Sequence, residues 1–595
     1  MKPTIEILDR IRENSKSNKE EIFTRLHRYM LRPDLYYLAY KNLYANKGAS
    51  TKGVDSDTAD GFSEEKISRI IKLLSDESYV PKPVRREYIK KRNSTKKRPL
   101  GLPTFTDKLV QEVLRMILEA VYEPTFSNFS HGFRPNRSCH TALKSLKREF
   151  TGATWFIEGD IKSCFDSIDH HTLVEFIGFK IKDARIIKLI WKFLKAGYME
   201  DWKYHNTYSG CPQGGIVSPI LANIYLNELD KFVEKTTREF YKPKDKIRTN
   251  EYANIAAKRD YARMKLQAAK GYEKTELLKR IKFLTSELHR VPCSSRTDKV
   301  VKYIRYADDF IIGIKGDKSD CENIKLQLSE FIKQSLKMEL SEEKTLITHS
   351  NQYARFLGYD IRVRREQKLK PSGSRLSRTL NNKVELNVPL SDKIMFFLFD
   401  KAIIKQSRDG KIEPIARKNL YRCTDLEIIS TYNSELRGIC NYYGLASNFT
   451  RLDYFAYLME YSCLKTLAGK HKSTSNKMVE KYHVKNRGWG IPYKTTKGQK
   501  YCVFAKYQNC KNADSFNDVI IESATRYSKS TTTLEKRISA QICELCGETD
   551  IPLEIHHVNK VKNLKGKSDW EIIMIAKKRK TLAVCKICHH KIHHP

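Results

Sequence analysis

Two adjacent carboxylates inside an apolar run are the residues of this sequence best suited to chemistry. The segment 302–315 reads KYIRYADDFIIGIK, in which Asp308 and Asp309 interrupt a β-prone stretch. Burying unpaired carboxylates is costly, and two neighbours also repel each other. A pair of acids can hold Mg²⁺, however, because this ion prefers a few carboxylates together with water and substrate phosphates. The simpler alternative is that both are ordinary turn residues.

A third carboxylate strengthens the metal hypothesis. The segment 153–168, ATWFIEGDIKSCFDSI, has the alternation of a strand and delivers Asp160 at its end. Three carboxylates converging from two neighbouring strands could bind two metal ions, which activate a 3′-hydroxyl and stabilise a leaving pyrophosphate. Asp166 and Asp169 precede a helical run and fit helix capping better than metal binding.

Two CxxC pairs form a second cluster near the end of the sequence. They are CELC at 543–546 and CKIC at 585–588. Four thiolates in this pattern are typical of structural zinc, which would stabilise a module too small for a large core. The predicted zinc ligands are Cys543, Cys546, Cys585 and Cys588.

Histidines lie between and after these cysteines, in EIHHV (554–558) and CHHKIH (588–593). His589 and His593 are four residues apart, hence on one helical face, and His556 could join them on a divalent metal. His557 would then be free to deprotonate a water molecule. The run of neighbouring histidines leaves two other helix ligands open, His590 and His594. A zinc-stabilised DNA-binding module without cleavage is the alternative function.

The composition points to a polyanionic partner. The 595 residues include 110 Lys and Arg against 70 Asp and Glu, a net charge of +40. Such a field favours nucleic acid first and a membrane surface second. No segment reaches the roughly 18 apolar residues of a transmembrane helix, and the first residues lack the apolar core of a signal peptide. The 14 cysteines do not suggest a disulfide scaffold in so long a chain. We therefore expect a cytoplasmic, nucleic-acid-associated protein.

The elements that must position these residues follow from the patterning. Residues 1–75 have helical patterns, and β-like runs alternate with helical ones from about 80 to 365, which predicts a mixed α+β body. A charged stretch at 250–290 predicts a helical insertion, and packing on its host through one face is favoured over a coiled-coil interface. Residues 366–383 have the composition of a basic linker or flexible loop, and residues 385–470 are mostly helical.

The order of several motifs resembles the reverse transcriptases. EGDIKSCF, PQGGIVSPILAN, YADD, LSEEKT and FLGY follow one another as the palm and finger motifs of these enzymes do. Residues 98–143 resemble the fingers blocks of the group II intron-encoded branch, and the resemblance to LtrA-type maturases covers nearly the whole chain. The C-terminal module resembles an HNH nuclease. It departs from that pattern at Lys580–Leu582, where many such modules carry Asn, so the orientation of His557 must be arranged differently.

This resemblance implies a multidomain α+β protein. A right-hand polymerase, with an antiparallel palm sheet and a helical thumb, would be joined to a zinc-stapled ββα-metal (HNH) module. The implied domains are an N-terminal helical extension of the fingers (1–75), the reverse transcriptase fingers and palm (76–365, with a helical insertion at about 233–295), a basic linker (366–384), the thumb or maturase domain (385–475), a DNA-binding region (476–540) and the HNH endonuclease (541–595).

The resemblance also implies roles for single residues of the polymerase. The catalytic metal-binding triad would be Asp160, Asp308 and Asp309. Phe165 matches the aromatic gate that excludes a 2′-hydroxyl, with an ordinary core aromatic as the alternative. Gln213 and Gly214 match a turn that contacts the incoming nucleotide and the template. Lys344 falls where a lysine neutralises or protonates the leaving phosphate, with a surface lysine as the alternative. The segment 356–359 fits a hairpin that grips the primer end.

Nucleic-acid contacts are implied in the thumb and beyond it. Tyrosines could stack on bases and Arg437 could bind phosphate, although a packed helix–helix interface would give the same pattern. The RNA-binding candidates are Tyr432, Asn433, Arg437, Tyr442 and Tyr443. Residues 470–510 mix basic and aromatic side chains, and the family binds its DNA target in this region. The DNA-binding candidates are Lys485, Arg487, Trp489, Lys494, Lys497 and Lys500.

The function implied is that of a multifunctional group II intron-encoded protein. It would bind its intron RNA and assist splicing, nick a double-stranded DNA target, and copy the RNA into DNA with deoxynucleoside triphosphates. By the same likeness His557 is the nuclease base, and His556, His589 and His593 hold Mg²⁺ or Mn²⁺. Mg²⁺ would serve the polymerase and Zn²⁺ the four cysteines, in the bacterial cytoplasm, and a homodimer is plausible.

Three rival functions remain. A splicing-only maturase is opposed by the three intact carboxylates. A retron-type or CRISPR-associated reverse transcriptase is opposed by the long thumb and the HNH module. An RNA-dependent RNA polymerase is disfavoured by the bulky Phe165.

Overall fold

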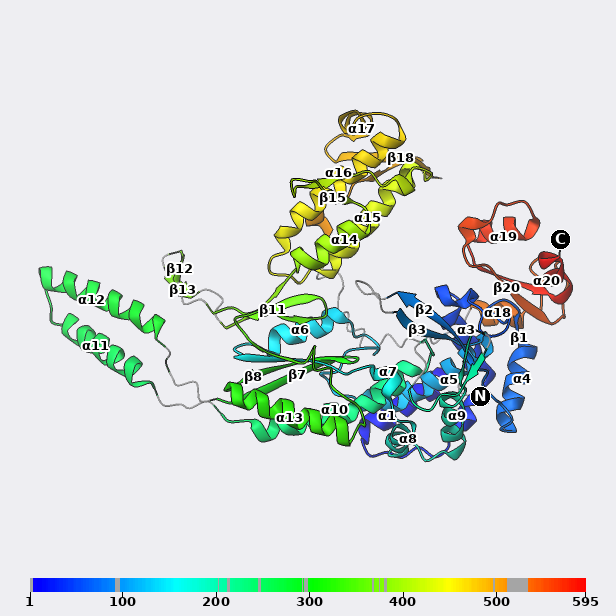
Figure 1. The fold of residues 1–595 in the computed structure, drawn as a ribbon, viewed down its shortest axis with the longest axis horizontal. Coiled ribbons are helices and arrows are strands. Elements are labelled where there is room, and N and C mark those ends of the chain that lie inside the picture. The colour runs from blue at the N-terminus through cyan, green and yellow to red at the C-terminus, as the bar shows by residue number, and fades with distance from the viewer. Residues whose placement is uncertain are drawn as a thin grey trace.

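The structure is a computed structural model, and most of the chain is described in it. The described residues are 4–90, 97–201, 203–210, 214–243, 248–291, 293, 298–365, 369–373, 375–378, 382–495, 498–510 and 533–594. Two of the predicted site residues, Gln213 and Lys497, lie outside these ranges. A central body carries a helical domain above it, a helix pair at the left and the C-terminal module at the right (Figure 1).

A four-stranded antiparallel sheet forms the centre of the body, in the order β7-β8-β4-β9. Its strands are β4 (Trp155–Asp160), β7 (Val300–Tyr306), β8 (Asp309–Lys315) and β9 (Leu346–His349). Side chains alternate across it, so that Ile157 packs in the core below the sheet and Phe156 in the core above. The helices α10 (Ser218–Phe240) and α13 (Lys318–Gln334) lie below, and α6 (Cys139–Glu149) lies above (Figure 1).

The N-terminal part packs around one buried helix, α5 (Phe105–Tyr122). Thr104 caps this helix by accepting a hydrogen bond from the Asp107 amide. The helices around it are α1 (Thr4–Ser17), α2 (His27–Met30), α3 (Pro33–Leu43), α4 (Glu64–Ser75), α7 (Cys164–Ser167), α8 (His170–Gly178) and α9 (Ala184–Leu194). A second sheet, ordered β3-β2-β5-β6, consists of β2 (Val84–Lys90), β3 (Lys97–Leu102), β5 (Tyr198–Glu200) and β6 (Lys203–His205).

The charged insertion forms a hairpin of two helices, α11 (Asn250–Leu266) and α12 (Gly271–Arg290). These helices pack on each other and project away from the body (Figure 1). The prediction of helix is confirmed, but the prediction that it packs on its host is wrong, because Leu284 and Leu288 are buried within the pair itself. The preceding helix α10 continues to Phe240, so the insertion begins later than residue 233.

The predicted linker contains regular structure. The strands β12 (Leu369–Ser372) and β13 (Arg375–Arg378) pair as a hairpin. The strands that flank this hairpin in sequence form a small sheet of their own. They are β10 (Ala354–Phe356) and β11 (Tyr359–Val363) before it and β14 (Val384–Asn387) after it. The described residues of the predicted basic linker or flexible loop thus include a paired hairpin.

The helical domain above the body continues past residue 475. Its elements are α14 (Met395–Asp400), β15 (Ile404–Gln406), β16 (Ile412–Pro414), α15 (Asp425–Tyr442), α16 (Leu452–Lys470), α17 (Ser475–Lys481), β17 (His483–Val484), β18 (Gly488–Thr495) and β19 (Gly498–Val503). Met478, Trp489 and Phe504 belong to the same hydrophobic core as the helices. The three-stranded sheet β17-β18-β19 is thus packed on the helices rather than separate from them.

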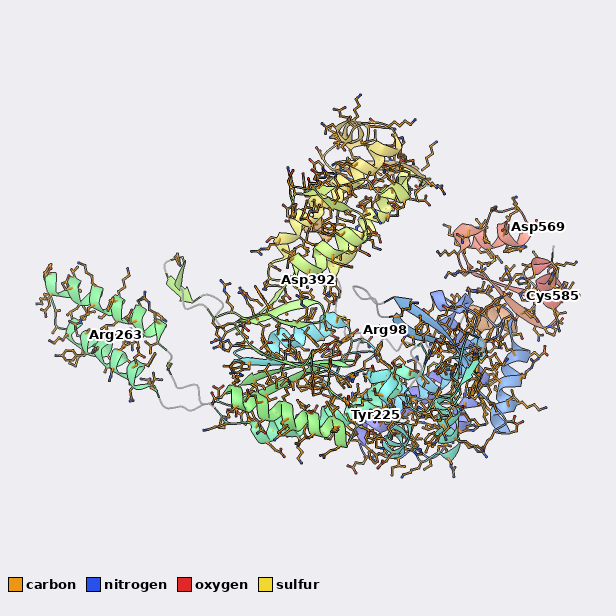
Figure 2. All side chains as sticks on the ribbon, viewed as in Figure 1. Arg98, Tyr225, Arg263, Asp392, Asp569 and Cys585 are labelled. Carbon is orange, nitrogen blue, oxygen red and sulfur yellow. The ribbon has the colours of Figure 1, made fainter. Side chains whose placement is uncertain are left out.

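The C-terminal module consists of α18 (Thr533–Ser539), β20 (Leu553–His557), α19 (Asp569–Lys577), β21 (Thr581–Cys585) and α20 (Lys586–His593). A short N-terminal strand, β1 (Phe62–Ser63), completes its sheet in the order β1-β20-β21. Figure 2 labels Cys585 in this module and Arg263 on the projecting helix pair, at opposite ends of the molecule. Among the described helices, none has the length and apolar character needed to cross a membrane.

Candidate functional sites

The three predicted polymerase carboxylates meet at one edge of the central sheet. Asp160 ends β4 and lies directly opposite Asp309, the first residue of β8. Asp309 also pairs with Tyr306 of β7, so Ala307 and Asp308 form the turn between the strands. The backbone of Ala307 is left-handed, with φ of 57°. Non-glycine residues rarely adopt this conformation, and functional sites are among the places where it occurs.

The electrostatics of this edge suit a cation. The surrounding protein removes water from Asp309, and the charges of Asp308 and Asp160 add to the effect, so the pKa of Asp309 rises to about 7 although its side chain reaches the surface. Burial and the charge of Asp160 also raise the pKa of Asp308. Lys344 donates a hydrogen bond of 2.6 Å from Nζ to Asp160 Oδ2 and partly balances the charge. Three carboxylates in a partly desolvated cluster fit Mg²⁺ ligands.

A buried ion pair supports this turn, and sequence reasoning missed it. Arg305 and Asp230 are both fully buried, and Arg305 Nη2 lies 2.6 Å from Asp230 Oδ2. Arg305 Nη1 donates to the carbonyl oxygen of Ala307 at 2.9 Å, and thereby holds the turn from below. Gly132 lies against the same turn, because a Cβ placed there would come within 2.3 Å of the Ala307 nitrogen. Asn223 donates to the Gly132 carbonyl oxygen.

The candidate nucleotide residues lie beside this edge. Phe165 is half-buried in α7 and meets the ring of Phe133 edge-on at 6.1 Å. Gly214 has φ of 110°, and a Cβ there would come within 2.4 Å of the Gly101 carbonyl oxygen on β3. The turn therefore needs glycine for both reasons. A cavity of about 400 Å³ borders this region and is lined by Arg86, Gly101, Asp166, Tyr198 and Tyr208 among others. Asp169 caps α8 as predicted.

Two of the five RNA-binding candidates are buried in the helical domain. Tyr432 is fully buried, and its hydroxyl bonds Ser462 and Thr466. Asn433 is buried and donates to the Val503 carbonyl oxygen at 2.8 Å. Their polar atoms are satisfied inside the protein, so neither side chain faces RNA, and both are withdrawn as contact candidates.

The other three candidates divide between two positions. Tyr442 donates to the Leu357 carbonyl oxygen at 2.6 Å, and Tyr443 donates to the Gly358 carbonyl oxygen at 3.2 Å. They therefore attach the helical domain to the FLGY turn. Arg437 is exposed on α15.

An exposed aromatic stripe on α16 was not among the predicted RNA-binding residues. Tyr454, Tyr457 and Tyr461 are 42–52% exposed and lie ring to ring, with centroids 6.2 and 4.5 Å apart. Their spacing of three and four residues, which puts them on one helical face, was the signal that could have found them.

The basic candidates on the sheet of this domain are mostly at the surface. The exposed ones are Lys485, Arg487, Lys494 and Lys500. Trp489 is buried instead, stacks on Phe504 at 5.3 Å and donates to Glu460. Its indole is part of the core, so Trp489 is withdrawn as a DNA-contact candidate.

The four predicted zinc ligands converge. The sulfur atoms of Cys543, Cys546, Cys585 and Cys588 all lie within 4.8 Å of one another. Tetrahedral zinc with sulfur ligands at about 2.3 Å places these atoms about 3.8 Å apart, and the Cys546 and Cys585 sulfurs are 3.9 Å apart. Backbone amides of Cys546 and Cys585 donate to the Cys543 sulfur. The donor set and its spacing fit zinc.

The three predicted histidine ligands also converge, and the two alternative helix histidines lie apart from them. Ring nitrogens of His556, His589 and His593 come within 4.8 Å of one another. His590 and His594 are exposed and lie against each other, with ring centroids 4.5 Å apart. Glu554 accepts a hydrogen bond from His589 Nδ1 at 2.6 Å, which leaves Nε2 for a ligand. Burial opposes the charged form of His589, but the hydrogen bonds that its ring donates to Asp60 and Glu554 outweigh this effect and raise its pKa to about 9.

His557 is held by the N-terminal part of the chain. Its Nε2 donates to the Tyr44 carbonyl oxygen at 3.1 Å, and its ring meets that of Tyr44 edge-on. A carbonyl partner requires the proton on Nε2 and leaves Nδ1 as the basic nitrogen. Burial lowers the pKa of His557, so the ring is neutral at pH 7. This contact provides the orientation for which no Asn was found in the sequence.

Comparison with family models defines the class of protein. Residues 89–253 match a reverse transcriptase (RNA-dependent DNA polymerase), and this match includes Asp160 but ends before Asp308 and Asp309. Residues 381–536 match a type II intron maturase, and residues 543–589 match an AI2M/AI1M-like HNH endonuclease. The protein is thus a reverse transcriptase that also carries maturase and endonuclease domains.

Similar proteins give the family. The chain is 59% identical over 596 residues, covering all of both chains, to the group II intron-encoded protein LtrA of Lactococcus lactis subsp. cremoris. It is 33% identical to a putative COX1/OXI3 intron 2 protein of Saccharomyces cerevisiae, covering 98% of this chain and 68% of that one. It is 34% identical to an uncharacterized 91 kDa protein in the cob intron of Schizosaccharomyces pombe, covering 98% and 72%.

The chain belongs to the group II intron-encoded proteins. It is a multifunctional enzyme of that family, an RNA-directed DNA polymerase and DNA endonuclease with a maturase domain. Both enzymatic domains are of kinds that work with divalent metal ions, and the four-cysteine cluster is consistent with zinc. The splicing-only and other bacterial reverse transcriptase alternatives are not favoured, because all three domains are present together.

Proposed function

We propose that Asp160, Asp308 and Asp309 hold Mg²⁺ at the centre of a right-hand polymerase, with the N-terminal part as fingers, the β7-β8-β4-β9 sheet as palm and the helical domain as thumb. The observation that carries this proposal is the pairing of Asp160 with Asp309 across β4 and β8 beside the strained turn. Bound Mg²⁺ would supply charge neutralisation for the triphosphate and activation of the primer 3′-hydroxyl.

The chain's own residues would position the nucleotide. Phe165, beside Phe133, would contact the sugar and exclude a 2′-hydroxyl, while the tight turn at Gly214 would bring the backbone close to the base pair. Lys344, which is two-thirds exposed and bonded to Asp160, could move its ammonium group to the leaving phosphate. Tyr442 and Tyr443 would fix the 356–359 hairpin against the primer end.

Primer extension on an RNA template with Mg²⁺ tests the polymerase site. We expect the wild type to incorporate deoxynucleotides and not ribonucleotides, and the double variant Asp308→Ala/Asp309→Ala to incorporate neither. The control Glu342→Ala removes an exposed acid near the site and should keep activity. Deoxynucleotide incorporation by the double variant would contradict the assignment. Loss of assisted splicing while the RNA complex still forms would contradict the separation of the polymerase and splicing functions.

We place the intron RNA on the thumb, at Arg437 and the exposed stripe of Tyr454, Tyr457 and Tyr461. Exposed tyrosines favour stacking on unpaired bases, and Tyr457 lines one pocket with the basic residues Arg487 and Lys506. Base stacking is worth about 1–3 kcal/mol per aromatic residue, so Tyr457→Ala should weaken intron RNA binding by roughly 5- to 150-fold. Tyr261→Ala on the projecting helix pair is the matched control, because Tyr261 is 56% exposed against 47% for Tyr457. Equal affinity of the two variants would contradict this placement.

We propose further that the HNH module nicks the DNA target and that the polymerase extends the nicked 3′ end. His557 Nδ1 would take a proton from water, and His556, His589 and His593 would hold the divalent ion that stabilises the cleaved phosphate. The basic surface of Lys485, Arg487, Lys494 and Lys500 would bind DNA backbone. His557→Ala should lose nicking and keep primer extension, whereas the exposed His590→Ala should keep both. Continued nicking by His557→Ala would move the base role to another residue.

A further inference from the structure

A carboxylate from the N-terminal part of the chain lies inside the histidine cluster of the HNH module. Asp60 precedes β1, which pairs antiparallel with β20, so that Phe62 lies opposite Ile555. The Gly61 amide donates to the Ile555 carbonyl oxygen at 3.0 Å, and the His557 amide donates to Asp60 Oδ1 at 2.6 Å. The reverse transcriptase body therefore supplies both a strand and an acid to the endonuclease module.

The carboxylate faces ring nitrogens on three sides. Asp60 Oδ2 lies 2.8 Å from His593 Nε2, and Asp60 Oδ1 lies 3.2 Å from His556 Nδ1 and 3.4 Å from His589 Nε2. One ligand atom from each of the four residues lies within 4.8 Å of all the others. Distances of this size are those of ligands around a single ion at about 2.1 Å from each nitrogen or oxygen.

His556 gives an independent sign that a ligand belongs here. It is 4% exposed, its Nε2 makes no hydrogen bond to the described residues, and its Nδ1 has only the 3.2 Å contact with Asp60, which lacks hydrogen-bond geometry. A buried polar atom without a hydrogen bond destabilises the fold, and a metal ion at the cluster would remove that cost for the nitrogen that binds it. Trp570 meets the His556 ring edge-on and fixes its direction.

The segment that carries Asp60 is fixed by packing against the N-terminal helices, so Asp60 can serve as a metal ligand. Phe62 is fully buried and stacks on Tyr40 with centroids 4.1 Å apart. Tyr40 in turn donates from its hydroxyl to the Ala59 carbonyl oxygen. Phe62 and Ile555 belong to one continuous hydrophobic core, so the contact between body and module is a packed interface.

We propose that Asp60 is the fourth protein ligand of the endonuclease metal, so that the nuclease site is complete only when the HNH module is docked on the N-terminal segment. The inference rests on the proposed role of the histidines. A carboxylate among imidazoles moves the site toward oxygen-preferring ions such as Mn²⁺ and Mg²⁺. Metal binding and docking then stabilise each other, because each favours the same arrangement.

Mn²⁺ binding to the full chain tests this proposal without reference to cleavage. The polymerase site is removed by Asp308→Ala/Asp309→Ala, the cysteine site is filled with zinc, and free Mn²⁺ is measured by electron paramagnetic resonance. We expect one Mn²⁺ per chain, and at least about 10-fold weaker binding in Asp60→Asn, since even indirect partners of metal ligands change affinity 10- to 100-fold. Asn keeps the acceptor for the His557 amide. Asp550→Asn, an exposed acid of the same module, is the control and should bind as the parent does.

The outcomes separate this proposal from the one it rests on. Parental Mn²⁺ affinity in a folded Asp60→Asn, with the site lost in His556→Ala, would overturn the role of Asp60 and leave the histidine set intact. Retention of Mn²⁺ by His556→Ala would overturn the histidine set itself. If circular dichroism shows that Asp60→Asn is unfolded, Asp60→Glu decides: restored Mn²⁺ binding supports the proposal, and a folded Asp60→Glu without Mn²⁺ overturns it.

Discussion

The buried pair of Arg305 and Asp230 offers a quantitative test of how the polymerase turn is held. Both side chains are 0% exposed, and two hydrogen bonds of 2.8 and 2.6 Å join them. Arg305 also donates to Ser130 and to the Ala307 carbonyl oxygen, while Tyr303 donates to Asp230. Asp230→Ala would remove the acid and leave the guanidinium in a site without water.

The expected loss of stability in Asp230→Ala follows from this burial. Breaking a buried pair by removing one partner costs about 3–5 kcal/mol, because the remaining charge stays unpaired. The exposed pair of Lys162 and Glu339, with side chains 68% and 70% exposed, provides the comparison. Glu339→Ala should cost at most about 1 kcal/mol, because water screens such pairs. Replacing both buried partners, in Asp230→Leu/Arg305→Met, should recover most of the stability, since apolar side chains of similar volume tolerate burial.

Stability and activity should separate in the double variant. Urea unfolding followed by tryptophan fluorescence measures the first, and primer extension on RNA measures the second. Met cannot donate to the Ala307 carbonyl oxygen, so we expect primer extension to stay low after stability has returned. Equal destabilisation by Asp230→Ala and Glu339→Ala would refute the electrostatic reasoning. Wild-type primer extension by the double variant would refute the claim that Arg305 positions the turn.

Three further changes test other parts of the chain. Gly132→Ala would place a Cβ within 2.3 Å of the Ala307 nitrogen and so displace the turn that carries Asp308. A displacement of about 1 Å can reduce a reaction rate roughly 100-fold, so the rate of primer extension should fall by about this factor. Gly178→Ala, where a Cβ would meet open space, should leave the rate unchanged. Burial opposes ionisation of Asp425, but hydrogen bonds from Lys470, Tyr482 and His471 lower its pKa to about 2. Its contribution is present above the unfolded pKa of about 4 and lost as the pH falls toward 2, so urea unfolding should separate wild type from Asp425→Asn most at pH 6, by about half as much at pH 3 and least near pH 2. Cys546→Ser should lower the zinc content and nicking while primer extension persists, and unchanged zinc would contradict the four-cysteine site.

The sequence predicted the convergence of residues wherever a local rule determined their direction. Asp160 and Asp309 end and begin buried strands, and an antiparallel neighbour brings such ends together. His589 and His593 share a face because they are four apart on a helix. In both sites the residues belong to the motifs from which the site was predicted, so their spacing in the sequence was sufficient to predict that they converge.

Composition could not determine which face of a helix or strand a residue occupies. Tyr432 and Asn433 have the residue types of an RNA surface, yet their hydroxyl and amide groups bond inside the domain. The spacing of the α16 tyrosines shows that they share a face, but it does not show that this face is exposed, as Tyr457 is. Polar types are compatible with burial when partners are present, and those partners come from distant segments.

Long-range partners were the residues that no spacing could reveal. Tyr44 and Asp60 reach His557 across about five hundred residues of chain, and Gly132 reaches Ala307 by packing alone. The consequence concerns the order of the two reactions. In the function we propose, the nuclease produces the 3′-hydroxyl that the polymerase extends. His557, the proposed nuclease base, donates to the carbonyl oxygen of Tyr44, in the N-terminal segment that also packs on α5. If nicking requires this docked arrangement, cleavage takes place only where the polymerase body is already in place, which ties each cut end to the enzyme that will use it.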